Sequence, residues 1–211
     1  MKQTVLTGLF LLGSIAVYAQ KIDLQQMLAK GNILEVPGSE VKNMSDADKR
    51  GITAKNNLWL KGIDFSYGTI EVDIRGRNEF LHSFPGIAFH ASDTSRAYDL
   101  VYFRPFNFRS TDPVRRTWSI QYSSGPEYDY ENLRKEHKGE FESEILPNPK
   151  PEDWIHARIV IGKDSIKVYV NGMDKPSLVT RVLHNRDKGM IGLWLDYTTA
   201  DFANLSITKG H

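Results

Sequence analysis

Strict alternation of apolar and polar side chains is the feature that most constrains how this chain can fold. In residues 69–75, Ile70, Val72 and Ile74 alternate with charged neighbours. Successive side chains of a β-strand point to opposite faces, so this pattern predicts a strand with one buried and one wet face. Comparable runs, rich in aromatic and β-branched residues, occupy 86–90, 98–104, 118–122, 155–161, 166–170, 190–196 and 202–207, with weaker candidates at 33–36, 51–55 and 58–60. About ten strands separated by turn residues are typical of a sandwich or barrel.

One segment has the composition of a helix. Residues 130–137 contain Glu, Leu, Arg and Lys without a helix breaker, and Gly139 can end the helix. This segment lies in a long polar insertion, residues 123–153, and residues 24–30 could add one helical turn near the N-terminus. We therefore expect an all-β fold with one short helix in a long loop, and long loops on a rigid scaffold often carry binding residues.

Size, charge and cysteine content narrow the class further. The chain has 211 residues and no internal repeat, which favours one domain. Its formal net charge of +1 argues against a nucleic acid as the main partner, because binding a polyanion requires a basic surface. It contains no Cys, which excludes disulfides and cysteine-ligated metals, so the fold must be stabilised by packing.

The first 19 residues have the pattern of a secretory signal peptide. Lys2 supplies a positive charge, and residues 5–17 form an apolar stretch too short to span a bilayer. Ala19 is a small residue at the expected cleavage position, which makes Gln20 the mature N-terminus. We expect a secreted or periplasmic bacterial protein with a single domain over residues 20–211 and no membrane span after cleavage. An uncleaved membrane anchor is the alternative.

Five short motifs, in order along the chain, resemble the strands of the concanavalin A-like lectin and glucanase superfamily, which includes laminin G-like domains. They are FSYGTIEV at 65–72, GIAFH at 86–90, WIHARIV at 154–160 followed by IKVYVNG at 166–172, GMIGLW at 189–194, and DFANL at 201–205. The resemblance extends from about Ile33 to Ile207 and is greatest to bacterial 3-keto-disaccharide hydrolase-type domains. It implies a two-sheet antiparallel jelly-roll sandwich that acts on carbohydrate. Trp154, at the start of a strand, is expected to close the open end of the core.

Glu71 and Asp73 are the candidate catalytic carboxylates. Two residues apart on a strand, they share a face with side chains roughly 7 Å apart, a separation that acid–base chemistry on a glycosidic bond can use. The resembling glucanases carry a third acid in this run, whereas Ile74 and Arg75 follow here. The missing acid favours an ordinary wet face with ion pairs. His90 could join as an acid–base group or a hydroxyl contact, although a lone histidine on a strand is more often structural.

The segment 98–122 carries the candidate binding residues. Sugars are bound by aromatic rings that stack on C–H surfaces and by forked donors and amides that fix the hydroxyl groups. If Tyr102 and Arg104 share a strand face, they point together toward the ligand. The predicted ligand-binding residues are Tyr102, Arg104, Asn107, Arg109, Arg116, Trp118 and Gln121. In the alternative interpretation Phe103, Phe106 and Phe108 belong to the core and the arginines form a solvated rim.

No metal site or cofactor is expected from the sequence. The six histidines are scattered and show no zinc-binding spacing. Some laminin G-like and glucanase relatives hold a structural calcium ion, which Asp64 or Asp201 could bind here, although no loop has a dense run of acidic ligands.

Three functions are compatible with these observations. The first is carbohydrate binding on the concave sheet face, without catalysis. The resemblance implies the second, glycoside or 3-keto-disaccharide hydrolysis, so whether the chain is an enzyme stays open. The third is a laminin G-like module that binds a protein partner, which a flat apolar patch would favour. Both sheets follow the same alternation, which leaves open which strand faces are concave.

Overall fold

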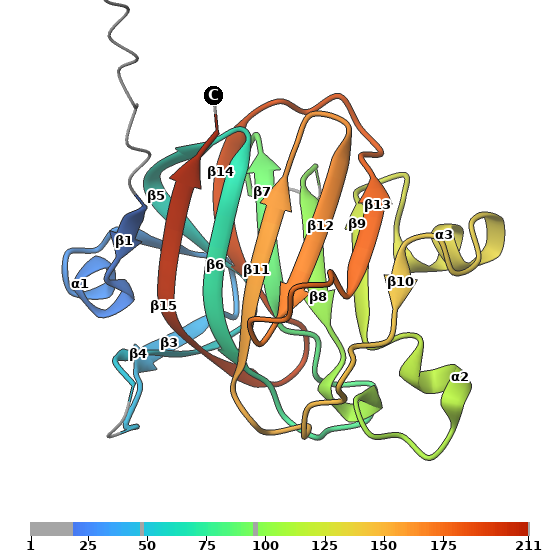
Figure 1. Cartoon of the computed structure of the whole chain (residues 1–211). Helices are drawn as coiled ribbons and strands as arrows, with labels where there is room; N and C mark the ends of the chain where they lie inside the picture. Colours follow the sequence, from blue (N-terminus) through green and yellow to red (C-terminus); the bar gives the residue numbers. More distant parts are fainter. Residues whose placement is uncertain (1–18, 47–48, 95–96, 211) are drawn as a thin grey trace, which may run out of the picture.

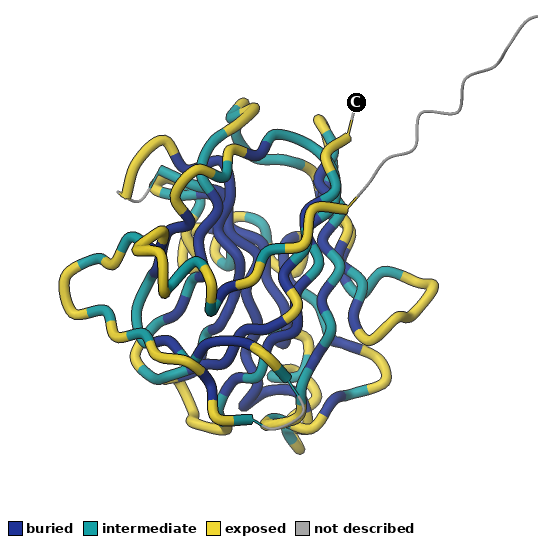
Figure 2. The backbone as a smooth tube through the Cα atoms, turned by 90° about the vertical axis from the view of Figure 1, so that its left-hand side faces the viewer, coloured by how far each residue is buried: buried dark blue, intermediate teal, exposed yellow. Residues whose placement is uncertain are grey.

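The computed structural model describes residues 19–46, 49–94 and 97–210. Over this part of the chain, two antiparallel sheets are stacked face to face with the hydrophobic core between them. Figure 1 shows the two sheets one behind the other, with α2 and α3 at the right-hand side. In Figure 2 the buried positions run through the centre of the fold and the exposed positions gather in the loops.

The eight-stranded sheet has at its centre the strand in which alternation was strongest. Its order is β13 (Leu178–Arg181), β12 (Ser165–Val170), β11 (Ile155–Ile161), β6 (Gly68–Arg75), β15 (Thr199–Lys209), β4 (Gly51–Lys55) and β3 (Glu40–Asn43), and β1 (Gln20–Ile22) also pairs with β15. In β6, Ile70, Val72 and Ile74 are fully buried and face the core. Glu71 and Asp73 therefore lie on the outward face.

The seven-stranded sheet is built largely from the middle of the chain. Its order is β10 (Glu142–Ser143), β9 (Ile120–Ser124), β8 (Asp99–Phe103), β7 (Gly86–Ala91), β14 (Gly189–Trp194), β5 (Leu58–Phe65) and β2 (Ile33–Glu35). Every residue of β7, β8 and β9 is buried. The sheet is thus covered on both faces, although only one of them packs against the core.

The helices are short and lie at the edges of the sandwich. They are α1 (Leu24–Ala29), α2 (Pro113–Arg116) and α3 (Tyr130–Glu136), with a 3-10 turn at Pro105–Asn107. Asp112 caps α2 by accepting a hydrogen bond from the Val114 amide at 2.8 Å. No helix of the described residues is long and apolar enough to cross a membrane.

The predicted fold class is confirmed: the chain is an all-β, two-sheet antiparallel sandwich. The helix predicted over 130–137 is present as α3, in the insertion between β9 and β11. Strands β1, β3, β10 and β13 were not predicted, because each is an edge strand of at most four residues. Helix α2 was also missed, although an Asp followed by Pro is a recognisable start for a helix.

Candidate functional site

The outward face of the seven-stranded sheet carries a second apolar cluster, separate from the core. Ala88 and Leu100 belong to it, and they alternate along their strands with the core residues Ile87 and Val101. We call this surface the aromatic face. Its aromatic members are Trp59, Phe84, Tyr98, Tyr102 and Trp194.

The rings of the aromatic face contact one another directly. The Trp59 and Tyr98 ring centroids are 5.4 Å apart, and the Trp194 indole N–H donates a hydrogen bond of 2.9 Å to the Tyr98 hydroxyl. A Cβ at Gly192 would lie 2.8 Å from the Trp59 ring, so only glycine lets this indole approach β14 so closely. The Trp59 Nε1 group is buried without a hydrogen-bond partner.

Strand register aligns the middle of the aromatic face with a polar edge. Trp194, Gly86, Tyr102, Gln121 and Glu142 are successive partners across β14, β7, β8, β9 and β10. Directly opposed residues of neighbouring strands lie on the same face. Glycine in this row removes one side chain and allows the Tyr102 and Trp194 rings to approach to 5.5 Å. The row therefore runs from an indole to a carboxylate across one face of the sheet.

The polar end of this row consists of two hydrogen-bonded groups joined by a longer ion pair, and we call it the arginine cluster: Tyr102, Arg104, Gln121, Arg134 and Glu142. Arg104 Nη2 donates to the Tyr102 hydroxyl at 2.6 Å and also to Gln121 Oε1, and the Tyr102 hydroxyl donates to the same oxygen at 2.8 Å. Arg134 Nη2 donates to Glu142 Oε2 at 2.9 Å, and Arg104 Nη1 is 3.9 Å from that oxygen. Arg104 is only 5% exposed and Glu142 8%.

Burial sets the electrostatics of the arginine cluster. Desolvation lowers the pKa of Arg104 and raises the pKa of Tyr102. The Arg134 guanidinium lies 4.2 Å from the Trp118 ring centroid, and its Nε has no partner. With two guanidinium groups and one carboxylate, the cluster has a surplus of hydrogen-bond donors.

The structure brings four of the seven predicted binding residues directly into this site. Tyr102, Arg104 and Gln121 are members of the cluster, and the Trp118 carbonyl accepts a 2.9 Å hydrogen bond from Arg104 Nη1. Asn107 lies just behind it, buried, with its Nδ2 at 3.5 Å from the same carbonyl.

Arg109 and Arg116 are directed elsewhere. Arg109 donates to the Asn148 carbonyl at 3.3 Å, and Arg116 binds Glu144 at 2.8 Å. Both arginines therefore hold the loop before β11 rather than the aromatic face. The predicted packing role of the phenylalanines also has structural support, because Phe103 and Phe108 belong to the core.

Sequence reasoning missed Trp59, Tyr98, Arg134, Glu142 and Trp194 as members of this surface. Arg134 and Glu142 lie in the long insertion that was predicted to carry binding residues. Their position in this insertion was the one sequence feature that indicated a role in binding. Trp59 and Trp194 lie on predicted strands, where nothing in the sequence distinguishes the outward face of this sheet from its core face.

His90 faces the interior of the sandwich and is 2% exposed. Its Nδ1 lies 3.0 Å from Asp99 Oδ2 and its Nε2 lies 2.5 Å from the Ser66 carbonyl. Asp99 also accepts hydrogen bonds from the Tyr122 hydroxyl at 2.8 Å and the Ser124 hydroxyl at 2.5 Å. His90 is thus a fully bonded interior residue, apart from either outward face.

Glu71 and Asp73 lie on the outward face of the eight-stranded sheet, with His156 between them. His156 Nδ1 is 2.8 Å from Asp73 and its Nε2 is 3.8 Å from Glu71. Burial alone would raise the pKa of Asp73, but hydrogen bonds from His156, Lys49 and Asn204 outweigh it and hold the pKa well below its usual value. A general acid requires the opposite shift.

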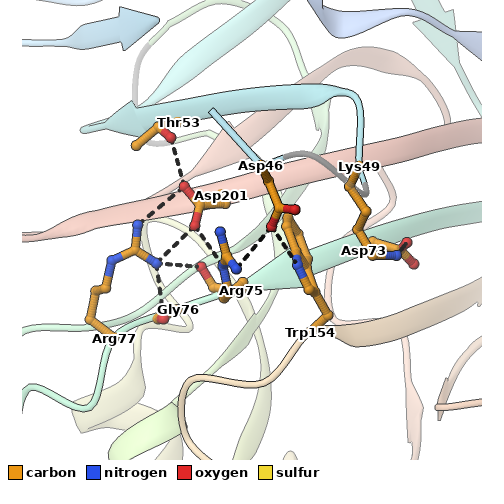
Figure 3. A network of polar contacts seen from close by, with 9 residues as sticks. All are labelled: Asp46, Lys49, Thr53, Asp73, Arg75, Gly76, Arg77, Trp154 and Asp201. Carbon is orange, nitrogen blue, oxygen red and sulfur yellow. Dashed lines mark hydrogen bonds and ion pairs between the residues drawn. The ribbon is translucent and has the colours of Figure 1, made fainter. Parts of the chain in front are cut away.

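A second ionic network lies on the same outward face (Figure 3). Asp201 accepts hydrogen bonds from Thr53 at 2.7 Å, Arg75 at 2.9 Å and Arg77 at 3.1 Å. Arg75 also pairs with Asp46 at 3.1 Å. These groups line a shallow cleft of about 630 Å³. Within this cleft, Arg75 and Arg77 are already paired with Asp46 and Asp201.

Trp154 belongs to this ionic surface, so its predicted role in closing the core is wrong. Its ring packs against the Arg75 guanidinium, 4.6 Å from the ring centroid, and its N–H is directed at Asp46 at 3.4 Å. Asp201, one candidate calcium ligand, is engaged by two arginines, and Asp64 is exposed on β5. Among the described residues, no three acidic or histidine side chains are grouped as metal ligands.

No protein-family model matches the sequence. No curated protein matches it either.

Solved structures match nearly the whole fold. A protein from Parabacteroides distasonis, provisionally named a glycosyl hydrolase, aligns with a TM-score of 0.60 and 13% identity over 92% of this chain and 100% of its own. A Bacillus subtilis protein with a galectin-like fold gives a TM-score of 0.56 and 13% identity over 90% and 94%. The Bacillus subtilis carbohydrate-binding module CBM66 gives 0.52 and 14% over 81% and 96%. At these identities the likeness shows the fold alone, a two-sheet β-sandwich of the kind that these proteins share.

Proposed function

We propose that the chain binds a carbohydrate on the aromatic face, next to the arginine cluster. The observation that carries this proposal is the row in which Trp194, Tyr102, Gln121 and Glu142 lie side by side on one outward sheet face. Aromatic rings offer stacking surfaces for the C–H faces of a sugar, while the amide, carboxylate and guanidinium groups bind its hydroxyls. A mostly apolar wall with a few aimed polar groups is the usual composition of a ligand site.

The energetic cost of the arginine cluster supports a role in recognition. Removing Arg104 and Glu142 from water is unfavourable, and an apolar set of similar volume would often be at least as stable. Arg134, by contrast, is half-buried, with its side chain 32% exposed and stacked on the half-buried Trp118. This places a partly exposed guanidinium at the edge of the buried network, where its Nη2 donates to Glu142. The likeness in fold to a carbohydrate-binding module agrees with this proposal.

Hydrolysis is the second candidate, and Glu142 is the residue that favours it. Most glycosidases need two carboxylates flanking the scissile bond. Within the arginine cluster, as far as the structure describes the chain, Glu142 is the single carboxylate. We therefore place binding ahead of hydrolysis and expect no product from a bound glycan.

We further propose that residues 1–19 are removed on export. Residues 1–18 lie outside the described residues, but Gln20 already pairs with Ile207 in the fold. Cleavage after Ala19 would therefore release a chain whose first residue belongs to a strand. Mass spectrometry of the exported protein tests this, and a mature chain that starts elsewhere would contradict it.

The experiment for binding uses residues 20–211 and a panel of immobilised plant and host glycans, including 3-keto-glucosides, with mass spectrometry of the supernatants. Arg104→Lys keeps the charge but loses the fork, so we expect at least roughly tenfold weaker binding. Arg158→Lys, on the outward face of the eight-stranded sheet, is the matched control and should bind normally. Binding without products supports recognition, and products lost in Glu142→Gln would establish hydrolysis. No response to any glycan would overturn the proposal in favour of a protein partner.

A further inference from the structure

Two large apolar residues near the aromatic face have a strained backbone. Leu81 has φ 61° and Tyr197 has φ 67°. Of the six described non-glycine residues with positive φ, three are asparagines, which tolerate this conformation well. Leucine and tyrosine do not, and strain of this kind persists mainly at functional sites.

Both residues also expose their side chains to water. Leu81 is 56% exposed and Tyr197 is 61% exposed. They lie on segments that pair with each other, because Ser83 forms an isolated bridge with Tyr197 and the Thr198 amide donates to the His82 carbonyl at 3.1 Å. The fold thus holds two apolar side chains in water at one place, in a conformation that each disfavours.

Tyr197 continues the aromatic face outward from its centre. The Phe84 ring lies between the two tyrosines, with its centroid 6.2 Å from Tyr102 and 6.3 Å from Tyr197. Tyr197 also meets the His82 ring at 5.6 Å, nearly perpendicular to it. A continuous series of rings therefore leads from the arginine cluster to an exposed tyrosine.

A second exposed tyrosine lies near the same surface. Tyr130, the first residue of α3, is 48% exposed. Its pKa is raised, first by its hydrogen bond to Glu131 and then by partial burial, with smaller contributions from the charge of Glu131 and from Tyr197. Tyr130 in turn affects the pKa of Tyr102. Tyr130 is therefore within electrostatic range of Tyr197 and of Tyr102.

We infer that Leu81 and Tyr197 form an outer sugar subsite, so that the ligand is a glycan chain of more than one sugar ring. This inference rests on the proposed function. One sugar lies at the arginine cluster, and the next lies against the Tyr197 ring with its C–H surface. Covering Tyr197 and Leu81 removes apolar area from water, which offsets the energy of holding them in a strained conformation.

The test compares monosaccharides with short oligosaccharides of the same sugar, beginning with glucose, cellobiose and cellotriose and the corresponding galactan, arabinan and fructan series. Tyr197→Asn removes the ring and places an amide that favours positive φ. We expect roughly tenfold weaker binding of the oligosaccharide, unchanged binding of the monosaccharide, and a melting temperature that does not fall. Leu81→Asn should act in the same direction. Tyr197→Phe keeps the ring and should retain most of the affinity.

Met173→Asn is the control, because Met173 is 40% exposed on a loop that contributes nothing to the aromatic face. It should leave every affinity unchanged. A Tyr197→Asn variant that melts lower but binds the oligosaccharide normally would show a purely structural role and overturn the inference. In that case Arg104→Lys would still weaken binding, and the proposed function would stand. If the wild-type chain binds no member of any series, both proposals fail together.

Discussion

The two outward faces of this sandwich follow the same alternation but have opposite chemistry. On β6 the outward residues Glu71 and Asp73 meet His156 and Lys49 in ion pairs. On β8 the outward residue Tyr102 is 5% exposed and belongs to an apolar cluster. Alternation decides which side chains leave the core, whereas the loops and neighbouring strands decide whether those side chains reach water.

The difference between the faces has an energetic meaning. On the eight-stranded sheet, charged groups balance one another; the exposed pairs contribute little to stability, whereas Asp73 and Asp201 are buried. On the seven-stranded sheet, the outward residues Trp59 and Tyr102 are as buried as the core, Phe84, Tyr98 and Trp194 are half-buried, and a buried arginine is added to them. A sheet face of this kind stabilises the fold and also presents binding groups at its margin. Substitutions on the two faces should therefore differ in magnitude.

The largest expected effect is Trp59→Ala on the aromatic face. Trp59 is 1% exposed, and truncating a buried aromatic residue lowers the free energy of unfolding by about 3–5 kcal/mol. Tyr169→Ala is the matched substitution on the eight-stranded sheet, where the half-buried ring packs under Arg158 at 3.8 Å. It should cost about 1 kcal/mol or less. Urea denaturation measures both, and equal losses would remove the distinction between the faces.

Asp201→Ala should produce the next largest effect. Asp201 lies on the outward face of the eight-stranded sheet, which we call the ionic face. Removing the carboxylate that two arginines and Thr53 share should lower stability by about 2–3 kcal/mol near neutral pH. Burial alone would raise the pKa of Asp201, but hydrogen bonds from Arg77, Thr53 and Arg75 lower it below 3.8. The stabilisation is therefore complete above the unfolded pKa and is lost as pH falls through the lower folded value.

The measurement for Asp201 is urea denaturation of wild type and variant between pH 2 and 7. The gap between them should narrow as the solution becomes more acidic. Thr53→Val, which removes a single hydrogen bond, is the control and should cost about 1 kcal/mol. A gap that stays constant down to pH 2 would show that the carboxylate is not held by its charge.

Tyr102→Phe tests the link between the aromatic face and the arginine cluster. The hydroxyl accepts from Arg104 and donates to Gln121, so its removal should cost about 1 kcal/mol and loosen the orientation of the guanidinium. We expect weaker glycan binding by a few-fold, measured by affinity electrophoresis. Tyr169→Phe is the control and should change neither property. Unchanged affinity in Tyr102→Phe would show that ligand binding does not depend on this hydrogen-bond network.

The fold could be predicted from the sequence because alternation is local. The alternation of Ile70, Val72 and Ile74 predicts a strand with one buried face, whichever sheet the strand joins. The site could be predicted only in part. Tyr102 and Arg104 are two residues apart on one strand path, so their shared face follows from the period of the strand. The participation of Glu142 depends on its pairing with Gln121, which is set by how the insertion after β9 returns to the sheet. That register arises from tertiary packing.

Trp154 and His90 lie elsewhere than expected for the same reason, because contacts distant in the sequence decide where they lie. Trp154 was expected in the core because large apolar residues at strand ends usually pack there. It lies instead outside the core, where the Arg75 guanidinium and the Lys49 ammonium group pack over its ring. His90 was considered for catalysis, but its left-handed backbone, with φ 56°, accompanies a side chain that points inward to Asp99. Local sequence carries no signal for either contact.

The smallest expected effect is a pH dependence specific to the ionic face. The hydrogen bond to Asp73 raises the pKa of His156 above 6.5. This stabilisation is fully present below pH 6.5 and is lost as pH rises through the folded value. Because the His156 side chain is 42% exposed, screening by solvent limits it to a few tenths of a kcal/mol. Urea denaturation between pH 5.5 and 8.5 should show that His156→Gln flattens this slope, and that 0.5 M salt has a similar effect on wild type. An unchanged slope in His156→Gln would mean that the ion pairs of His156 with Asp73 and Glu71 do not contribute to stability.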